Sequence, residues 1–232
     1  MGDMVEFASN GDTARGYLAT PDLGSGPGVI VVQEWWGLNP QIKRVADRLM
    51  AEGFVALAPD LYRGELAGHD EMDKAGQLMA GLPMDRAARD MSAAVDFLAE
   101  HTASVGDGIG VVGFCMGGGL ALRLGTLRPD KIKAVVSYYG VLGFDDDNAP
   151  DWSKLDAPVL GHYGEKDDFF PPGKANALEA GLRGLGKTVD FTVHAGLGHA
   201  FASEDDVFGT FDRDVAEQTW QRTVAFLQQH LA

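Results

Sequence analysis

The amino-acid sequence predicts an α/β protein whose mostly parallel central sheet is covered by helices on both faces. Short apolar runs alternate with amphipathic segments along the whole chain, as in proteins built from strand–helix–strand units. Several apolar runs are continuous, which is typical of strands that are buried on both faces. The 232 residues contain no internal repeat and no low-complexity linker, so we expect one domain that spans residues 1–232.

The expected elements follow one another in a regular order. Strands are expected at 4–10, 14–20, 27–34, 54–60, 108–114, 134–140, 158–164 and 189–194. Helices are expected at 39–53, 70–82, 84–100, 116–127, 173–184 and 212–230. The first two strands alternate apolar and polar residues around a turn near Gly11 and Asp12, which indicates an antiparallel hairpin at the edge of the sheet.

The segment 27–53 shows how these elements are recognised. Its first part, PGVIVVQE (27–34), is a continuous β-branched run, as expected of a buried parallel strand. Asn39 can cap the helix that follows, Pro40 suits its first position, and apolar residues recur at helical spacing until Gly53.

Composition and charge exclude several classes of function. Nineteen basic against 34 acidic side chains give a net charge of -15, which repels nucleic-acid phosphates and anionic lipid surfaces. The single cysteine cannot form an internal disulfide, and no Cys/His cluster indicates a metal site. No apolar run approaches the roughly 20 residues that cross a bilayer, and the first 16 residues lack the features of a secretory signal. We therefore expect a cytoplasmic protein without nucleic-acid or membrane partners.

The segment GVVGFCMGGG (110–119) carries the clearest indication of chemistry. It leads from an expected strand into an expected helix, and its centre, from Gly113 to Gly117, has the form G-x-C-x-G. Glycines on both sides allow a tight turn that lifts the central side chain above the sheet. Cys115 then stands at a helix N-terminus, where free N–H groups favour a thiolate and can bind an oxyanion. A lone cysteine is commonly inert and buried, but this context favours a nucleophile.

Acidic residues and a histidine follow two later strands. GEKDDFFPP (164–172) contains Asp167 and Asp168, and AGLGHAF (195–201) places His199 in a glycine-rich loop. Either aspartate could orient the histidine, and the alternative for both is a solvated turn. The chain order nucleophile, acid, base is that of α/β-hydrolases. The sequence thus predicts a Cys-His-Asp triad at the carboxyl ends of the strands, where reactive groups gather in such sheets.

An acid and two tryptophans follow the strand 27–34. Glu34, Trp35 and Trp36 occur in succession at the expected strand end. Large aromatic side chains in this place favour a substrate pocket, with packing in the core as the alternative.

Together these segments resemble the dienelactone hydrolase family of α/β-hydrolases, over nearly the whole chain. The motifs that carry the resemblance are VVQEWWGLN (31–39), APDLYRG (58–64), GVVGFCMGG (110–118), SYYG (137–140), GEKDDFFPP (164–172) and GHAF (198–201). The pattern G-x-C-x-G-G with an upstream Q-E is quite specific to this family within the fold. The resemblance implies hydrolysis of a small-molecule lactone or ester, with no metal and no organic cofactor.

The resemblance also implies roles for the site residues. Cys115 matches the family's nucleophile and His199 its histidine, and the spacing to the flanking glycine and proline selects Asp167 as the acid. Glu34 matches a glutamate that pairs with the resting thiol, is displaced by substrate and then helps to form the thiolate.

The same motifs imply how substrate is held. The backbone N–H groups of Met116 and Trp35 would form the oxyanion hole. Trp36, Tyr139 and Phe201 are candidate residues of the substrate pocket.

One departure concerns the substrate's carboxylate. Founding members of the family hold it with two arginines, whereas the best matches in this chain are Met72 and Ser203. The natural substrate is therefore open. The basic residues that could substitute are Arg63, Lys74, Arg86 and Arg89.

The expected mechanism is a two-step acyl transfer through a thioester. Two other classes of function are compatible with the residues: a redox-sensing or binding protein with a reactive thiol, and a hydrolase of thioesters or small peptides. We expect a monomer, with a homodimer as the alternative.

Overall fold

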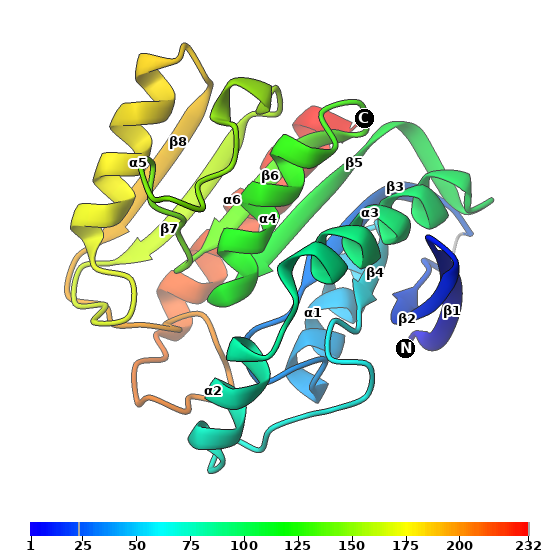
Figure 1. The fold of residues 1–232 in the computed structure, drawn as a ribbon, viewed down its shortest axis with the longest axis horizontal. Helices are drawn as coiled ribbons and strands as arrows, with labels where there is room; N and C mark the ends of the chain where they lie inside the picture. Colours follow the sequence, from blue (N-terminus) through cyan, green and yellow to red (C-terminus); the bar gives the residue numbers. More distant parts are fainter. Residues whose placement is uncertain (23, 232) are drawn as a thin grey trace.

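The computed structural model describes residues 1–22 and 24–231, and within them eight strands form one sheet (Figure 1). The strands are β1 (Asp3–Ser9), β2 (Asp12–Ala19), β3 (Gly26–Val32), β4 (Val55–Pro59), β5 (Ser104–Phe114), β6 (Ile132–Tyr138), β7 (Val159–Gly164) and β8 (Val189–His194). The helices are α1 (Pro40–Ala51), α2 (Met72–Ala80), α3 (Met84–Glu100), α4 (Met116–Leu127), α5 (Pro172–Gly184), α6 (Arg213–Leu231) and the short 3-10 helix η1 (Trp152–Lys154). In this described part of the chain, every helix is too short or too polar to cross a membrane.

The sheet is mostly parallel, as the sequence predicts. Its strand order is β1-β2-β4-β3-β5-β6-β7-β8. The β1–β2 hairpin and the β2–β4 pair are antiparallel, and every other pair of neighbours runs parallel. The predicted α/β fold class and the antiparallel hairpin at one edge are both confirmed.

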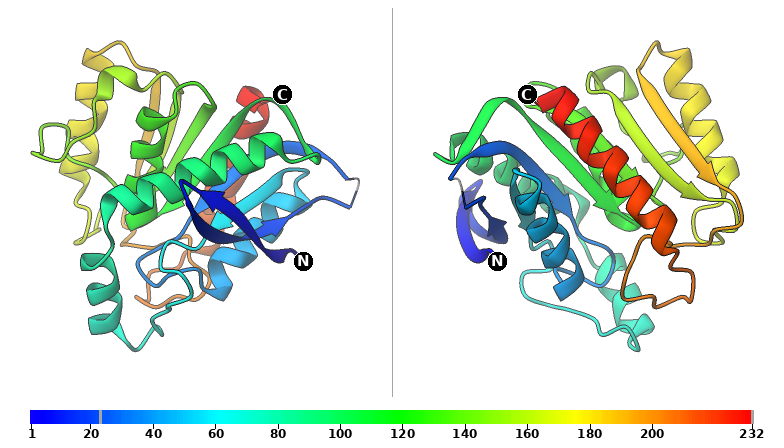
Figure 2. Two further views of the ribbon diagram at one scale, coloured as in Figure 1. Left: turned by 45° about the vertical axis from the view of Figure 1, so that its right-hand side comes forward. Right: turned by 180° about the vertical axis from the view of Figure 1, so that it is seen from behind.

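Helices cover both faces of the sheet (Figures 1 and 2). The helices α3, α4 and α5 pack on one face, where Met91, Leu120 and Leu178 enter the core. The helices α1 and α6 pack on the other, where Ile42 and Leu227 are fully buried. The short helix α2 belongs to neither layer and lies beside the edge at which the parallel strands end (Figure 1).

The caps predicted for α1 are present. The Oδ1 atom of Asn39 accepts a hydrogen bond from the N–H of Ile42 at 3.0 Å, and Pro40 occupies the first helical position. Gly53 follows the helix with φ +93°, a left-handed conformation that glycine adopts without steric cost.

Two local features differ from the sequence prediction. β5 begins at Ser104 instead of residue 108, because Ser104 pairs with Gly26 ahead of a register shift that the apolar pattern does not reveal. The helix η1 was not predicted, and its start is stabilised by the Asp151 side chain, which accepts a hydrogen bond from the N–H of Ser153.

The register of the sheet brings the segments after β3, β5, β7 and β8 together. Val32 near the end of β3 lies beside Gly113 of β5, and Gly164 at the end of β7 lies beside His194 of β8. The residues that follow these four strands therefore emerge at one edge, as expected of parallel strands.

Candidate active site

Cys115 stands directly after β5 and before α4. Its backbone has φ +54° and ψ -124°, which is costly for a residue with a side chain and persists only where the surroundings hold it. Two glycines permit the turn. A Cβ atom on Gly113 would collide with the carbonyl oxygen of Gly117, and one on Gly117 with that of Val32. The predicted sharp strand-to-helix turn is thus present.

The Cys115 thiol experiences opposing influences. Burial raises its pKa above the ordinary value for a thiol, and the nearby charges of Glu34 and Asp167 raise it further. The backbone N–H groups of Met116 and Trp35 form hydrogen bonds with the sulfur and act to lower the pKa. The raising influences prevail, so the thiol is protonated at neutral pH. This differs from the resting thiolate that a helix N-terminus alone would favour, because Cys115 is only 8% exposed and has acidic neighbours.

Asp167 and His199 form a buried hydrogen-bonded pair. Oδ2 of Asp167 lies 2.8 Å from Nδ1 of His199. The other carboxylate oxygen accepts the backbone N–H groups of Phe169 and Phe170 at 2.9 and 2.8 Å. Asp168 is exposed, so Asp167 is the aspartate that contacts the histidine. With both oxygens engaged, the carboxylate holds the His199 ring in one orientation and leaves Nε2 for other partners.

Glu34 is a buried acid beside this group. It is 3% exposed, and burial raises its pKa to about 7, with a further contribution from the charge of Asp205. The Glu34 charge also raises the pKa of the Cys115 thiol. The pKa of the Tyr139 hydroxyl is raised mainly by burial and, as the next largest cause, by the Glu34 charge. A carboxyl with a pKa of about 7 takes up and releases protons near neutral pH.

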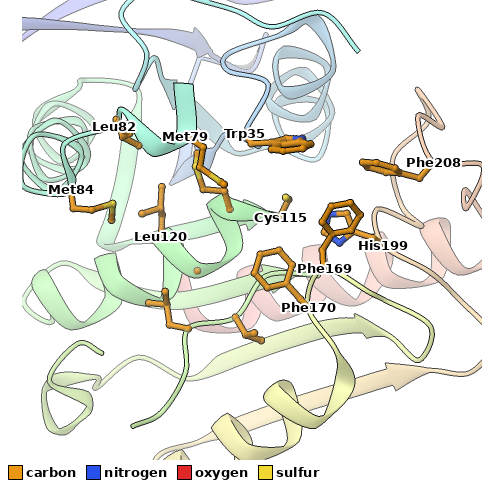
Figure 3. A pocket seen from close by; sticks show the side chains of 14 residues that line it. Trp35, Met79, Leu82, Met84, Cys115, Leu120, Phe169, Phe170, His199 and Phe208 are labelled. Carbon is orange, nitrogen blue, oxygen red and sulfur yellow. The ribbon is translucent and has the colours of Figure 1, made fainter. Parts of the chain in front are cut away.

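Cys115 and His199 open into one cavity of about 450 Å³ (Figure 3). This volume lies in the range of small-molecule sites. The cavity is lined by Trp35, Met79, Leu82, Met84, Cys115, Met116, Gly119, Leu120, Val141, Leu142, Phe169, Phe170, His199 and Phe208. The described residues of this wall include no Lys, Arg, Asp or Glu.

Three predicted pocket residues lie behind the wall instead of on it. Trp36 is 2% exposed and packs edge-on against Trp35 with ring centroids 4.9 Å apart. Tyr139 and Phe201 are fully buried, and the Tyr139 ring lies edge-on to His199 at 5.2 Å. The structure thus places these three side chains in the core and not among the residues that line this cavity.

None of the residues considered for carboxylate binding lines the cavity. Met72 is exposed at the first residue of α2, and Ser203 is buried after the His199 loop. The basic candidates are engaged elsewhere: Arg63 with Asp12, Lys74 with Glu71, Arg86 with the carbonyl oxygen of Leu61, and Arg89 with Asp85.

The sequence analysis does not identify most of the wall. Phe169 and Phe170 follow Asp167 by two and three residues in the GEKDDFFPP motif and could have been recognised from their position. The residues contributed by α2, α3 and α4 show only ordinary helical periodicity, which does not separate a cavity wall from a core.

Two further histidines lie away from this cavity. His162 Nδ1 is 3.3 Å from His194 Nε2, and burial lowers the pKa of both rings. Over residues 1–22 and 24–231, no group of three or more His, Cys, Asp or Glu side chains is arranged to hold a metal ion.

Comparisons with known proteins agree with this fold. The chain matches the family model described as the dienelactone hydrolase family over residues 14–231. It is 40% identical to "Protein usf" of Aquifex pyrophilus and 36% identical to "Putative carboxymethylenebutenolidase" of Aquifex aeolicus, with all of both chains covered in each case. The crystal structure of a "Putative Dienelactone Hydrolase" from Klebsiella pneumoniae is 29% identical, with a TM-score of 0.84 over 99% of this chain and 100% of that one.

Proposed function

The chain belongs to the dienelactone hydrolase family and is a carboxylic ester hydrolase, and we propose that it cleaves a lactone or an activated ester by acyl transfer to Cys115. One observation carries the proposal: the Cys115 thiol, with two N–H groups on its sulfur, opens into the same cavity as a histidine that a buried Asp167 orients. These are the parts of a nucleophile, an oxyanion hole and a general base.

The reaction begins with a proton transfer from the Cys115 thiol to the Glu34 carboxylate. The Cys115–Glu34 pair carries one negative charge before and after this step, so no new charge is buried. Neutralising Glu34 removes a cause of the raised thiol pKa, while the N–H groups of Met116 and Trp35 still favour the sulfur anion. The Glu34 pKa of about 7 suits a base that works near neutral pH.

The thiolate then attacks the substrate carbonyl carbon. A C–S bond forms, and the carbonyl electron pair moves to the oxygen, which the N–H groups of Met116 and Trp35 stabilise; losing one such donor costs about 10²–10³ in rate. The C–O bond breaks, the leaving group departs with the negative charge, and a thioester remains on Cys115.

Deacylation uses water and the Asp167–His199 pair. His199 takes one proton from water as the oxygen attacks the thioester carbonyl, and the C–S bond then breaks. The sulfur leaves as a thiolate and recovers from Glu34 the proton that it gave up in the first step. His199 releases its proton to solvent, and the carboxylic acid is released.

The nucleophile restricts the leaving group. A thiolate is itself a good leaving group, so a poor alkoxide would lose the competition to depart from the tetrahedral intermediate. Enol and aryl esters and enol lactones therefore suit the site, and simple alkyl esters and amides do not.

The structure disfavours a role as a thiol-based redox sensor. Sensor cysteines combine a low pKa with solvent access. Cys115 is 8% exposed and its pKa is raised, and a sensor has no need of the buried Asp167–His199 pair.

The test is intact-protein mass spectrometry after rapid mixing with 4-nitrophenyl acetate. We expect a transient acetyl adduct and many turnovers in the wild type, no adduct in Cys115→Ala, and an adduct that clears slowly in His199→Ala. A stable adduct in the wild type would make Cys115 merely reactive. Adduct-free turnover in Cys115→Ala would refute the thiol mechanism, and a thioester and dipeptide panel would show whether another bond is preferred.

A further inference from the structure

The cavity beside Cys115 has two chemically different sides (Figure 3). We define the aromatic side as Trp35, Phe169, Phe170 and Phe208, and the aliphatic side as Met79, Leu82, Met84, Leu120, Val141 and Leu142. In Figure 3, Met79, Leu82, Met84 and Leu120 lie on one side of Cys115, and His199, Phe169 and Phe208 lie on the other.

The aromatic side surrounds His199. The ring centroid of Phe169 lies 4.9 Å from that of His199, and those of Phe170 and Phe208 each lie 5.7 Å from it. Trp35 continues this group, 6.3 Å from Phe169. Flat aromatic surfaces therefore lie beside the imidazole that activates water.

The aliphatic side is formed by three separate segments. Met79 and Leu82 come from α2 and the turn after it, and Met84 begins α3. Leu120 lies on α4, and Leu142 follows β6. These side chains offer no hydrogen-bond donor and no charge to a ligand.

The chemistry assigns each side to one part of the substrate. Attacking water must be activated by His199, and it approaches the acyl carbon from the direction that the leaving group vacates. The leaving group therefore occupies the aromatic side. With the oxyanion held by the N–H groups of Met116 and Trp35, the acyl chain extends in the remaining direction, toward the aliphatic side.

We propose that the substrate joins an uncharged aliphatic acyl part, bound on the aliphatic side, to a planar aryl or enol leaving part, bound on the aromatic side. This inference rests on the proposed acyl transfer to Cys115 and adds the class of substrate. A carboxylate on the acyl part would lose its hydration against Met84 and Leu120 without gaining a cationic partner, so such substrates are rejected.

Three 4-nitrophenyl esters test the assignment through kcat/KM. Acetate and hexanoate differ by four methylenes, and the adipate monoester matches hexanoate in length but ends in a carboxylate. Burial on the aliphatic side predicts a gain of about fourfold per methylene, or about 10²-fold from acetate to hexanoate. The adipate monoester should fall about tenfold or more below hexanoate.

The variant Gly119→Val tests where the acyl chain of the substrate binds. A Cβ atom at Gly119 would lie 3.2 Å from Leu142 Cδ2, so a valine there fills the aliphatic side from α4. The hexanoate-to-acetate ratio of kcat/KM should fall at least about tenfold. Gly184→Val on α5 is the matched control, since its Cβ would meet no atom within 4 Å, and it should keep the wild-type ratio.

A second variant adds the missing charge. Met84→Arg should raise the adipate-to-hexanoate ratio at least about tenfold, because a guanidinium at the wall can pair with the carboxylate. Met72→Arg is its control: Met72 is 44% exposed, similar to Met84 at 46%, but lies outside the cavity. Ratios measured within one variant do not depend on how much of it folds.

The outcomes separate this inference from the proposed function. Thiol-dependent turnover with equal rates for acetate and hexanoate, or with adipate as the better substrate, would overturn the acyl assignment alone. A Gly119→Val ratio equal to that of wild type would also overturn it. No Cys115-dependent turnover of any of the three esters would overturn the proposed function itself.

Discussion

Two regions meet at the cavity, and they are built in different ways. The strand-end cluster, which is Glu34, Cys115, Asp167 and His199, follows the parallel strands β3, β5, β7 and β8 and is almost completely buried. The exposed wall, which is Met79, Met84 and Phe169, comes from α2, α3 and the loop after β7 and is 43 to 50% exposed.

The two regions differ in what they determine: the cluster carries out the reaction, and the wall determines which substrate is accepted. Backbone pairing, glycine contacts and buried hydrogen bonds fix the strand-end cluster. The exposed wall consists of side chains outside the strands, which can be exchanged without disturbing the sheet. We therefore expect substitutions in the cluster to change catalysis or stability strongly, and substitutions in the wall to change mainly which substrate is used.

The largest effect is expected at Asp167. In Asp167→Asn, the amide cannot hold His199 in the same tautomer, and kcat should fall about 10⁴-fold, as in other triads. Steady-state kinetics with 4-nitrophenyl acetate measures this. Asp168→Asn is the matched control, because Asp168 is exposed and should retain wild-type kcat. Equal losses in the two variants would mean that the loop as a whole, and not the Asp167–His199 bond, supports catalysis.

Substitutions at two glycines of α4 allow the stability of the turn at Cys115 to be compared with that of the cavity wall. A Cβ on Gly117 would strike the carbonyl oxygens of Val32 and Gln33, whereas one on Gly119 would meet the flexible end of Leu142 at 3.2 Å. Gly117→Ala should lower the free energy of unfolding by about 3 kcal/mol or more, and Gly119→Ala should change it by less than about 1 kcal/mol. Urea denaturation followed by circular dichroism gives both values. Similar losses would show that the wall is as rigid as the turn.

The same contrast explains what the sequence could predict. Continuous apolar runs and glycine-flanked turns are local patterns, so the eight strands and the turn at Cys115 can be found without a structure. The same patterns give the order Cys115, then Asp167 or Asp168, then His199, and the resemblance to the family selects Asp167. The wall depends on how α2 and the loop after β6 fold back on α4, which no local pattern specifies. The inward direction of Tyr139 and Phe201 is likewise a product of tertiary packing.

The raised pKa of Glu34 makes the stability of the folded protein depend on pH. Its pKa is about 7 in the folded protein against an ordinary value of 4.5, so between these pH values the folded chain binds more protons than the unfolded chain. The Glu34 contribution to stability is therefore lost as pH rises from 4.5 to 7, by about 3 kcal/mol in total. Glu34→Gln removes this loss, so its stability relative to wild type should rise by about that amount between pH 4.5 and pH 8.

Denaturation at several pH values checks this expectation. Glu6→Gln on the exposed face of β1 is the control and should follow the wild-type pH profile. A Glu34→Gln profile parallel to that of wild type would mean that the Glu34 carboxyl has the same pKa in the folded and the unfolded protein.

The smallest effect is expected on the aromatic side of the cavity. Phe208 lies edge-on to His199, at 5.7 Å, and contacts Phe169 at 5.4 Å. Phe208→Ala removes one aromatic contact with a planar leaving group, which is worth about 0.5–1.5 kcal/mol and so a rise in KM of about 2- to 12-fold for a 4-nitrophenyl ester.

Phe226→Ala provides the matched comparison, because Phe226 also lies edge-on to a histidine, His230 at 4.7 Å, but on α6 away from the cavity. Its KM should equal that of wild type. If Phe208→Ala lowered kcat and left KM unchanged, Phe208 would act by positioning His199 and would belong functionally to the strand-end cluster. A change confined to KM would mean that Phe208 acts through the aromatic side of the cavity, by binding the leaving group without affecting the reacting atoms.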